Sequence, residues 1–558
     1  MNEGDLAFRS MWSLVDGLAS RGVRLASLSP GSRSTAIALA LSRHPAIDLH
    51  VHLDERASAF FALGAAKATG VPAIVACTSG TASANLFPAI VEASMARMPL
   101  VVLTADRPPE LRGVGANQTI DQIELYGRYV RSFEDAPVPV DGDEDEWRRR
   151  GEAAAVTASA HPPGPVHVNL PFREPLVPTG AMELEASSER RSPPDATPDP
   201  SPRDIDRLAE RVRGVERGAI YAGGLRRAAP AVAELARSLG WPLIAEPHSG
   251  LRRGEALSAA QFLLADEAFV ERHRAEVVLQ FGAAPTSRAA LSFVAKAEHV
   301  VIVDPDDVAA DPGRRAELRV VADADRTAAA LLDRGDERAG AWPTMWREAD
   351  ERVRRAVDEL IDTWDQPFEG RVARDVADAI PDGSQLFVGS SMPIRDLDAY
   401  MRPRDGVRIL ANRGASGIDG SVSTTLGASV SWVPTFALLG DLTLLHDVGS
   451  LVWSARRGYR AVLVVVNNGG GAIFSMLDQR RLPELETLFT TPHDADLASV
   501  VPSAGAEHIC VRRADELIPA VCDARGDASI RVVEVVVDAR SNAERRDDVR
   551  RAVDRALG

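Results

Sequence analysis

The sequence ALLGDLTLLHDVGSLVWSARRGYRAVLVVVNNGGGAIF runs from Ala437 to Phe474 and predicts a strand–helix–strand unit. Its first apolar run ends at Gly440-Asp441, and a second apolar run is followed by Asn467-Asn468 and three glycines. In an open parallel sheet, ligands bind at the carboxyl ends of the strands. We therefore expect Asp441 and Asn468 to lie on one rim of a sheet, although they are well separated in the sequence.

The chemistry of this rim has two interpretations. An aspartate carboxylate, an asparagine carbonyl and a bare glycine backbone are hard oxygen donors, which suit Mg2+ bound to phosphate. The same residues also fit an ordinary strand-end turn, in which Asp441 caps a helix and the glycines allow tight geometry. The choice between them depends on what other strand ends bring to the rim.

Length and composition indicate a globular protein of about three domains, because 558 residues exceed what one core can hold. A formal charge of −16 argues against nucleic acid or an anionic membrane as a partner. The three cysteines form no CxxC pair, so a disulfide framework or a thiolate zinc site is not expected. The acidic N-terminus and the lack of a ~20-residue apolar run predict no membrane insertion and a cytoplasmic location.

Apolar runs alternate with helical stretches in three regions, which predicts an α/β protein with mostly parallel sheets flanked by helices. We divide the chain into a first unit (1–186), a proline-rich linker (187–202), a Rossmann-like central unit (203–341) and a third unit (342–558). The expected strands are Leu25–Leu28, Leu49–Leu53, Ala73–Ala76, Leu100–Thr104, Val166–Leu170, Ala219–Tyr221, Pro242–Ile244, Val277–Phe281, Val300–Val303, Gln385–Val388, Val407–Leu410, Thr435–Leu439, Val462–Val466 and Ile530–Val537.

Polar, loop-forming motifs follow the strands of the first unit. SPGSRS (29–34) supplies backbone amides at a helix start together with Arg33, and both attract anions. HLDER (52–56) places Glu55 in a first helical turn, where the helix dipole favours an acid whatever its function. CTSGTA (77–82), TADRP (104–108) and GANQT (115–119) continue the pattern and include Arg107. Each motif also fits a capped turn, but together they indicate a ligand-binding rim.

The third unit carries two further motifs of this kind. GSSMPIR (389–395) offers hydroxyls and amides that can hold a diphosphate, and NRGASGIDG (412–420) adds a glycine-rich loop. Arg395 and Arg413 are cationic groups that can bind an anion, although a helix salt bridge fits Arg395 equally well.

Several common site classes have no motif in this chain. There is no HExxH, no GxSxG and no GxxxxGK[ST], and the central unit has no complete GxGxxG. We accordingly expect neither a zinc enzyme, a serine hydrolase nor a P-loop enzyme, and we interpret the central unit as mainly structural.

With these residues assembled, the chain resembles thiamine diphosphate enzymes of the decarboxylase and acetohydroxyacid synthase class. Their GDG…NN motif reads here as Gly440-Asp441-Leu442 and Asn467-Asn468, so leucine replaces the third glycine. More specifically, the chain is similar to the 2-succinyl-5-enolpyruvyl-6-hydroxy-3-cyclohexene-1-carboxylate synthases of the menaquinone pathway. The motifs that carry this resemblance are SPGSRS, DERASAFFALG, TSGTASAN, TADRP, GANQTI, SSMPIRD, NRGASGIDG, GDLTLLHD and NNGGGAIF, with PTSR (285–288) in the central unit.

The resemblance implies a pyrimidine-binding domain, a central domain and a diphosphate-binding domain, with thiamine diphosphate and Mg2+ or Mn2+ as cofactors. Glu55 would hydrogen-bond the aminopyrimidine and promote formation of the reactive carbon nucleophile, and Gln118 would also take part in catalysis. The metal would be held by Asp441, Asn468 and the Gly470 carbonyl. The remaining cofactor contacts would come from Ser391, Met392, Ile418, Leu442 and Thr443.

The resemblance also implies the reaction. A succinyl carbanion, formed by decarboxylation of 2-oxoglutarate, would add in a 1,4 sense to isochorismate. Because both substrates are dicarboxylates, several arginines are expected around them. The implied substrate contacts are Ser32, Arg33, Arg107, Asn117, Gln118, Arg288, Ser391, Arg395, Arg413, Ile473 and Phe474. A homodimer would be the smallest active unit, with the site between the first unit of one chain and the third unit of another, and a homotetramer is usual in the family.

Three alternatives stay open from the sequence. A different thiamine diphosphate lyase would handle smaller substrates and need fewer arginines. A noncatalytic protein could keep the fold without the chemistry, although Glu55, Asp441 and Asn468 argue against it. Alternating strands and glycines also fit a nicotinamide dehydrogenase.

Overall fold

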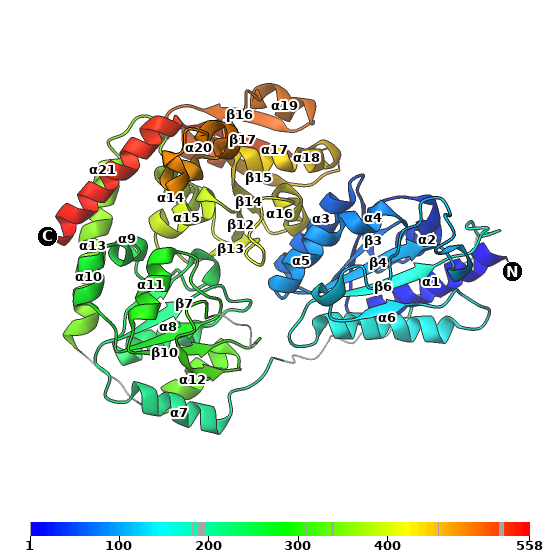
Figure 1. Cartoon of the computed structure of the whole chain (residues 1–558), viewed down its shortest axis with the longest axis horizontal. Helices are drawn as coiled ribbons and strands as arrows, with labels where there is room; N and C mark the ends of the chain where they lie inside the picture. The colour runs from blue at the N-terminus through cyan, green and yellow to red at the C-terminus, as the bar shows by residue number, and fades with distance from the viewer. Residues whose placement is uncertain are drawn as a thin grey trace.

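The computed structural model describes residues 2–180, 184–187, 197–306, 311–335, 340–455, 457–523 and 529–558. These residues form three sheets, each of them parallel throughout and flanked by helices (Figure 1). The α/β fold predicted from the alternating pattern is confirmed. Most of the proline-rich linker, residues 188–196, lies outside the described residues.

The first sheet has the order β2-β1-β3-β4-β6-β5. Its strands are β1 (Leu25–Leu28), β2 (Asp48–Val51), β3 (Ala73–Cys77), β4 (Leu100–Asp106), β5 (Phe133–Asp135) and β6 (Pro165–Pro171). Its helices are α1 (Glu3–Ser20), α2 (Thr35–Arg43), α3 (Glu55–Thr69), α4 (Thr81–Asn85), α5 (Phe87–Met95) and α6 (Glu144–Ser159).

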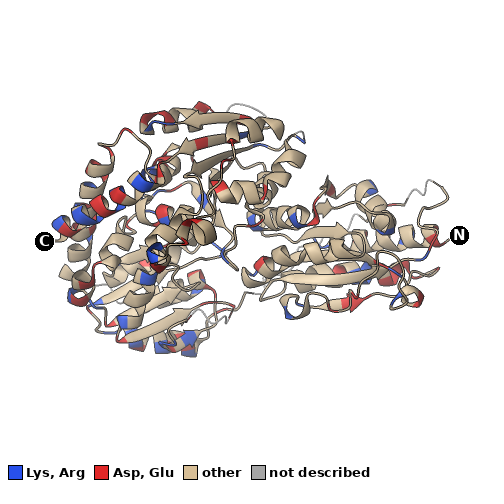
Figure 2. Cartoon of the chain, turned by 45° about the horizontal axis from the view of Figure 1, so that its top comes forward, with Lys and Arg blue, Asp and Glu red and all other residues tan. Residues whose placement is uncertain are grey.

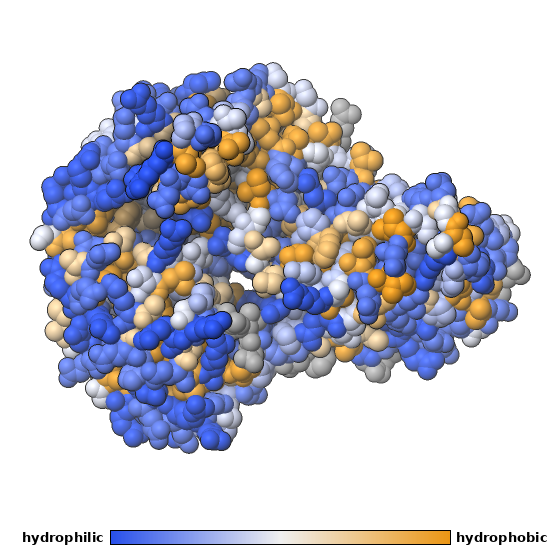
Figure 3. Space-filling model, in the orientation of Figure 1, coloured by the Kyte–Doolittle hydropathy of each residue, from blue (hydrophilic) through white to orange (hydrophobic). Residues whose placement is uncertain are grey.

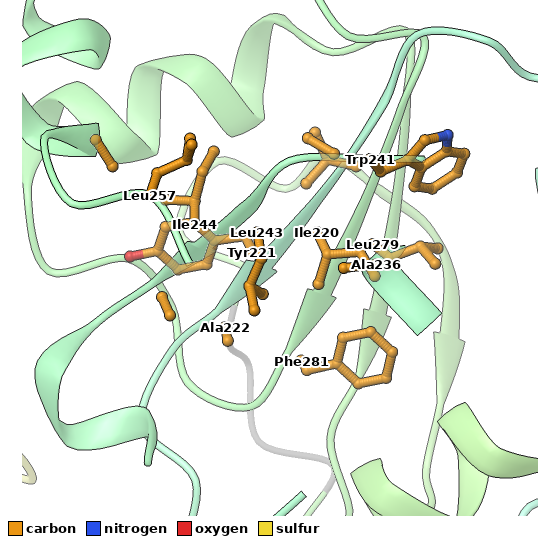
Figure 4. Close-up of a cluster of buried hydrophobic side chains, with 14 of the residues drawn as sticks. Ile220, Tyr221, Ala222, Ala236, Trp241, Leu243, Ile244, Leu257, Leu279 and Phe281 are labelled. Atoms are coloured by element: carbon orange, nitrogen blue, oxygen red, sulfur yellow. The ribbon is translucent and has the colours of Figure 1, made fainter. Parts of the chain in front are cut away.

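The central sheet has the order β11-β10-β9-β7-β8. Its strands are β7 (Gly218–Ala222), β8 (Leu243–Ala245), β9 (Val277–Phe281), β10 (His299–Val303) and β11 (Ala316–Val320). Its helices are α7 (Pro202–Val212), α8 (Pro230–Leu239), α9 (Ala260–Ala265), α10 (Glu267–Arg272), α11 (Arg288–Lys296) and α12 (Ala324–Leu332). Figure 4 shows part of its core, where Tyr221, Trp241 and Phe281 are buried among aliphatic side chains.

The third sheet has the order β13-β12-β14-β15-β17-β16, which repeats the order of the first sheet strand for strand. Its strands are β12 (Ser384–Val388), β13 (Val407–Ala411), β14 (Thr435–Gly440), β15 (Ala461–Asn467), β16 (Glu507–Val511) and β17 (Ile530–Val536). Its helices are α13 (Ala341–Ile361), α14 (Glu369–Ala379), α15 (Met392–Tyr400), α16 (Ser421–Ser429), α17 (Asp441–His446), α18 (Val448–Ser454), α19 (Leu497–Ser503), α20 (Leu517–Asp523) and α21 (Ala539–Leu557).

Three strands, β5, β11 and β16, were not expected from the sequence. Each lies at an edge of its sheet, and each includes exposed residues. An edge strand is covered less completely than a central strand, so its sequence lacks the continuous apolar run that marks a buried parallel strand.

The long helix α13 connects the central and third units. Trp342 and Trp346 on its first turns belong to the core of the central unit, and the Trp342 indole donates to the Gly218 carbonyl. Helix α21 lies beside α13 (Figure 1), and Val549 and Val553 of α21 join the same core. The C-terminal helix is therefore packed against the rest of the chain.

Helices α3 and α16 pack the first unit against the third at very short range. An added Cβ would lie 2.0 Å from the Thr424 carbonyl oxygen at Gly64, and 1.9 Å from the Phe61 carbonyl oxygen at Gly427. Only glycine permits such an approach of two backbones. This contact holds the middle and end of α16, which follows the glycine-rich loop 412–420.

In the view of Figure 2, basic and acidic residues are interspersed along the ribbon of all three units. Figure 3 shows a mostly hydrophilic surface with exposed hydrophobic residues on the first unit and near its junction with the others. Within the described residues, no helix is both long enough and apolar enough to cross a membrane.

Candidate active site

The carboxyl ends of β14 and β15 bring Asp441 and Asn468 together. One Asp441 carboxylate oxygen, Oδ2, accepts the backbone N–H groups of Asn468 at 3.2 Å and Gly470 at 2.9 Å. The other oxygen accepts the N–H of Leu442 at 2.6 Å. Burial raises the pKa of Asp441, while the Leu442 N–H and the charge of His493 oppose this shift.

A cavity of about 230 Å³ opens at this rim. Its described lining residues all lie between positions 369 and 474, so the first unit of the same chain contributes none of them. The cavity brings together the predicted cofactor, metal and wall residues Ser391, Met392, Ile418, Asp441, Leu442, Thr443, Asn468, Gly470, Ile473 and Phe474.

Asn468 presents an unpaired acceptor in this cavity. Its side-chain NH2 donates to Glu369 at 2.7 Å, and its Oδ1 is buried without a hydrogen-bond partner among the described residues. A buried carbonyl oxygen without a partner is costly unless a ligand satisfies it. Together with the Asp441 carboxylate, this oxygen fits a hard divalent cation.

Gly470 allows the close approach of a covering segment. Its φ is 149°, and a Cβ there would lie 2.5 Å from the Thr490 carbonyl oxygen. From the same segment, His493 Nε2 lies 3.3 Å from Asp441 Oδ2. A side chain at Gly470 would push this segment away from Asp441.

The first residues of helix α15 also line the cavity. Ser391, the residue before it, has a φ of 71°, which is unusual for a residue with a side chain. The N-terminal N–H groups of a helix attract anions, so the start of α15 fits a diphosphate. The residues at the cavity therefore fit thiamine diphosphate and its metal.

Three predicted substrate arginines gather near this cavity. Arg395 is exposed at the surface, but partial desolvation of its guanidinium lowers its pKa, and the charges of Arg413 and Arg288 lower it further. Arg413 belongs to loop 412–420, which Glu92 of the first unit holds by accepting the N–H groups of Gly414 and Ala415. Such a concentration of positive charge favours a carboxylate ligand.

The other predicted substrate residues lie at the rim of the first unit. Arg33 is buried and donates to the Phe172 carbonyl and to Glu174, while Arg107 donates to Ser79 Oγ and to the Asn117 carbonyl. Gln118 also donates to the Ser79 carbonyl. Burial and the charge of Arg33 lower the pKa of Arg107. Ser32 and the Asn117 and Gln118 side chains are exposed.

Glu55 is the first residue of α3, directly after the Asp54 cap. Its carboxylate accepts a hydrogen bond from Asn85 at 3.2 Å, and it does not line the cavity of its own chain. Apart from Arg288, which begins α11 of the central unit, the predicted residues therefore form two groups in one chain, one at the rim of each outer unit.

Four residues around the cavity were not expected from the sequence: Glu369, Asp396, Arg546 and His493. Glu369 and Asp396 line it, Arg546 binds both carboxylates, and His493 lies against Asp441. Burial raises the pKa of Asp396 to about 6, against the effect of Arg546. Asp396 stands in the SSMPIRD motif, whereas no local pattern marks the other three.

Comparisons with known proteins agree with this geometry. Residues 11–125 match the family described as thiamine pyrophosphate enzyme, N-terminal TPP binding domain, residues 204–388 match its middle domain, and residues 394–535 match its C-terminal TPP binding domain. Curated 2-succinyl-5-enolpyruvyl-6-hydroxy-3-cyclohexene-1-carboxylate synthases are similar over nearly their whole length. The protein of Thermobifida fusca is 44% identical with 98% of each chain covered, and that of Geobacillus kaustophilus is 42% identical with 95% of each covered. The protein of Halobacterium salinarum is 40% identical with 98% of each covered.

Proposed function

This chain belongs to the thiamine pyrophosphate enzymes, within the 2-succinyl-5-enolpyruvyl-6-hydroxy-3-cyclohexene-1-carboxylate synthase family, and we propose how its residues carry out that synthesis. It is a thiamine diphosphate-dependent enzyme that transfers a succinyl unit from 2-oxoglutarate to isochorismate, with loss of CO2, in menaquinone biosynthesis. We further propose that the enzyme uses Mg2+ or Mn2+ and that its active site lies between two chains. The roles given below to individual residues are also proposals.

The observation that carries the metal proposal is the unpaired Asn468 Oδ1 beside the Asp441 carboxylate. We assign the metal to Asp441, Asn468 and the Gly470 carbonyl, and the diphosphate to Ser391, Met392, Leu442 and Thr443. When bound, the cofactor would supply a carbon nucleophile for the decarboxylation of the 2-oxo acid. Ile418 supports it from the cavity wall.

The remaining residues bind and orient the substrates. Arg288, Arg395 and Arg413 form a group of positive charges that influence one another, and they would pair with substrate carboxylates. Arg33, Arg107 and Ser32, with Asn117 and Gln118, form the group at the rim of the first unit. Ile473 and Phe474 would exclude water from the reacting carbon atoms.

We assign the proton-holding role to Glu55. Its carboxylate would hydrogen-bond the aminopyrimidine and stabilise the form of the ring that accepts a proton. Because Glu55 does not line the cavity of its own chain, the partner subunit would supply it. The first and third sheets have the same strand order, so the two outer units have equivalent rims at the carboxyl ends of their strands. This equivalence supports a site in which the rim of one unit faces the rim of the other. A homodimer is then the smallest active unit, and a homotetramer would contain two such pairs.

The reaction is tested by incubating the protein with thiamine diphosphate, Mg2+ and 2-oxoglutarate, with and without isochorismate. The expected result is CO2 release coupled to formation of the succinyl adduct. Consumption of 2-oxoglutarate without any adduct would contradict the assigned acceptor and favour a simple decarboxylase.

The shared site is tested by mixing two inactive variants, Glu55→Gln and Asp441→Asn, under conditions that allow subunit exchange. If each site combines Glu55 of one chain with Asp441 of its partner, each hybrid dimer regains one native site. An equal mixture should then recover about a quarter of the parent activity. A mixture as inactive as its components, with exchange demonstrated, would place both residues in one chain.

A further inference from the structure

Two consecutive asparagines at the end of β15 each donate to a different buried glutamate. The Asn467 side-chain NH2 donates to Glu534 at 2.6 Å, and that of Asn468 donates to Glu369 at 2.7 Å. Glu534 and Glu369 are 7% and 3% exposed, so both pairs are shielded from water. The two pairs differ in what the asparagine carbonyl oxygens do.

The carbonyl oxygen of Asn467 is already used, whereas that of Asn468 is free. Asn467 Oδ1 accepts the Gly469 N–H at 3.1 Å, but Asn468 Oδ1 has no hydrogen-bond partner among the described residues. A carboxylate only accepts hydrogen bonds, so Glu369 must face the NH2 of Asn468 and not its oxygen. Glu369 thereby turns Asn468 Oδ1 away from itself.

Glu369 is itself held in place by the C-terminal helix. Arg546 of α21 donates to Glu369 Oε2 at 2.5 Å and forms a two-point pair with Asp396 at 2.7 and 2.9 Å. Asn542, also in α21, accepts the Glu369 backbone N–H at 3.1 Å. As the first residue of α14, Glu369 also lies where the helix dipole favours a carboxylate.

We propose that Glu369 is a positioning residue, which orients the Asn468 carbonyl oxygen for the metal, and that Arg546 of α21 holds Glu369 in the orientation required. This inference rests on the proposed metal site and extends it by one layer of residues. Without Glu369, the Asn468 carboxamide is free to rotate and to present its NH2 group, which repels a cation. Partners that orient a metal ligand typically contribute about 10- to 100-fold in affinity.

The network also sets the local charge. Two carboxylates, Glu369 and Asp396, share the single guanidinium of Arg546, which leaves a net negative charge beside the proposed cation. Charge alone would therefore also favour metal binding. A useful test has to separate this effect from orientation of Asn468.

The experiment measures the Kd for Mg2+ by titration calorimetry in the presence of saturating thiamine diphosphate. Glu369→Gln should raise the Kd at least about 10-fold, because a glutamine can accept or donate and no longer selects one amide orientation. Glu534→Gln is the matched control, since it alters an equally placed glutamate beside Asn467, and its Kd should stay within about twofold of the parent. Equal Kd values for Glu369→Gln and the parent, or equal shifts in both variants, would overturn the inference.

A second variant separates charge from orientation. Glu369→Asp keeps the carboxylate charge but withdraws it from Asn468 by one methylene group, so the Kd should still rise. It also serves if Glu369→Gln does not fold. A parent-like Kd for Glu369→Asp would show that charge alone matters and would overturn the positioning role.

The decisive comparison uses a chain that carries Asn468→Asp. A carboxylate presents oxygen in either orientation, so it needs no orienting partner, and it also repels Glu369. Adding Glu369→Gln to that chain should leave the Mg2+ affinity unchanged or increase it, in contrast to its effect in the parent. The same loss in both chains would identify a general structural effect and overturn the inference. A parent protein that binds no Mg2+ would instead overturn the proposed metal site itself.

Discussion

Replacement of Gly427 by alanine tests the close contact between the first and third units. The added Cβ would lie 1.9 Å from the Phe61 carbonyl oxygen, whereas ordinary contact begins at 3.4 Å. Helices α3 and α16 would therefore have to separate by about 1.5 Å. The obstacle is backbone on both sides, so no side-chain rotation can relieve it.

The expected cost lies at the upper end of the overpacking range, at about 3 kcal/mol. For a unit of this size, that corresponds to a fall in the thermal midpoint of roughly 6 to 12 °C. Because α16 follows loop 412–420, the displacement would also reach Arg413 and Ile418. A misplacement of about 1 Å near a reacting centre can cost about 100-fold in rate.

Scanning calorimetry of the protein and steady-state kinetics with 2-oxoglutarate and isochorismate provide the two readouts. Gly449→Ala is the matched control, because Gly449 lies in helix α18 and an added Cβ there meets no atom within 4 Å. It should leave the protein unchanged or raise its stability by about 0.5–1 kcal/mol. A Gly427→Ala protein that melts and turns over like Gly449→Ala would refute the backbone contact between α3 and α16.

Three other predictions concern the substrate, the metal and pH. Arg395→Ala should lower kcat/KM about 10- to 100-fold through loss of a charged hydrogen bond, while calorimetry shows unchanged thiamine diphosphate affinity; weaker cofactor binding instead would reveal a structural arginine. Chelation by EDTA should abolish both cofactor binding and activity, and added Mg2+ should restore them; cofactor binding that persists without metal would contradict the Asp441–Asn468 assignment. Burial lowers the pKa of His167 to about 3, whereas its pKa in the unfolded chain is about 6.5. Burial of the neutral imidazole therefore contributes fully to the free energy of unfolding above pH 6.5, and this contribution is lost as the pH falls from 6.5 towards 3. In denaturant unfolding between pH 6.5 and 4, the free energy of unfolding of His167→Gln should fall less steeply than that of the parent, by up to about 1.4 kcal/mol per pH unit. Parallel curves for the two proteins would mean that His167 is not buried as a neutral group.

The sequence alone determined the alternation of strands and helices and the place of the central strands. A strand buried on both faces needs a continuous apolar run, so β10, β14 and β15 can be recognised from a few residues of sequence. The sequence also determined which side chains follow the strands: Asp441 comes directly after one apolar run, and Asn468 comes after the next. Edge strands such as β16 carry a weaker pattern, since solvent covers part of them.

Only the tertiary structure decided how these local features combine. Glu369, Asn468 and Arg546 come from α14, the end of β15 and α21, and no periodic pattern links positions so far apart in the chain. The contact of Gly427 with Phe61 likewise requires two helices from different units to be brought together. The pattern of apolar residues that marks a buried strand or helix is visible in a short window of sequence. The orientation of one buried amide instead depends on hydrogen-bond partners that only the folded chain brings within reach.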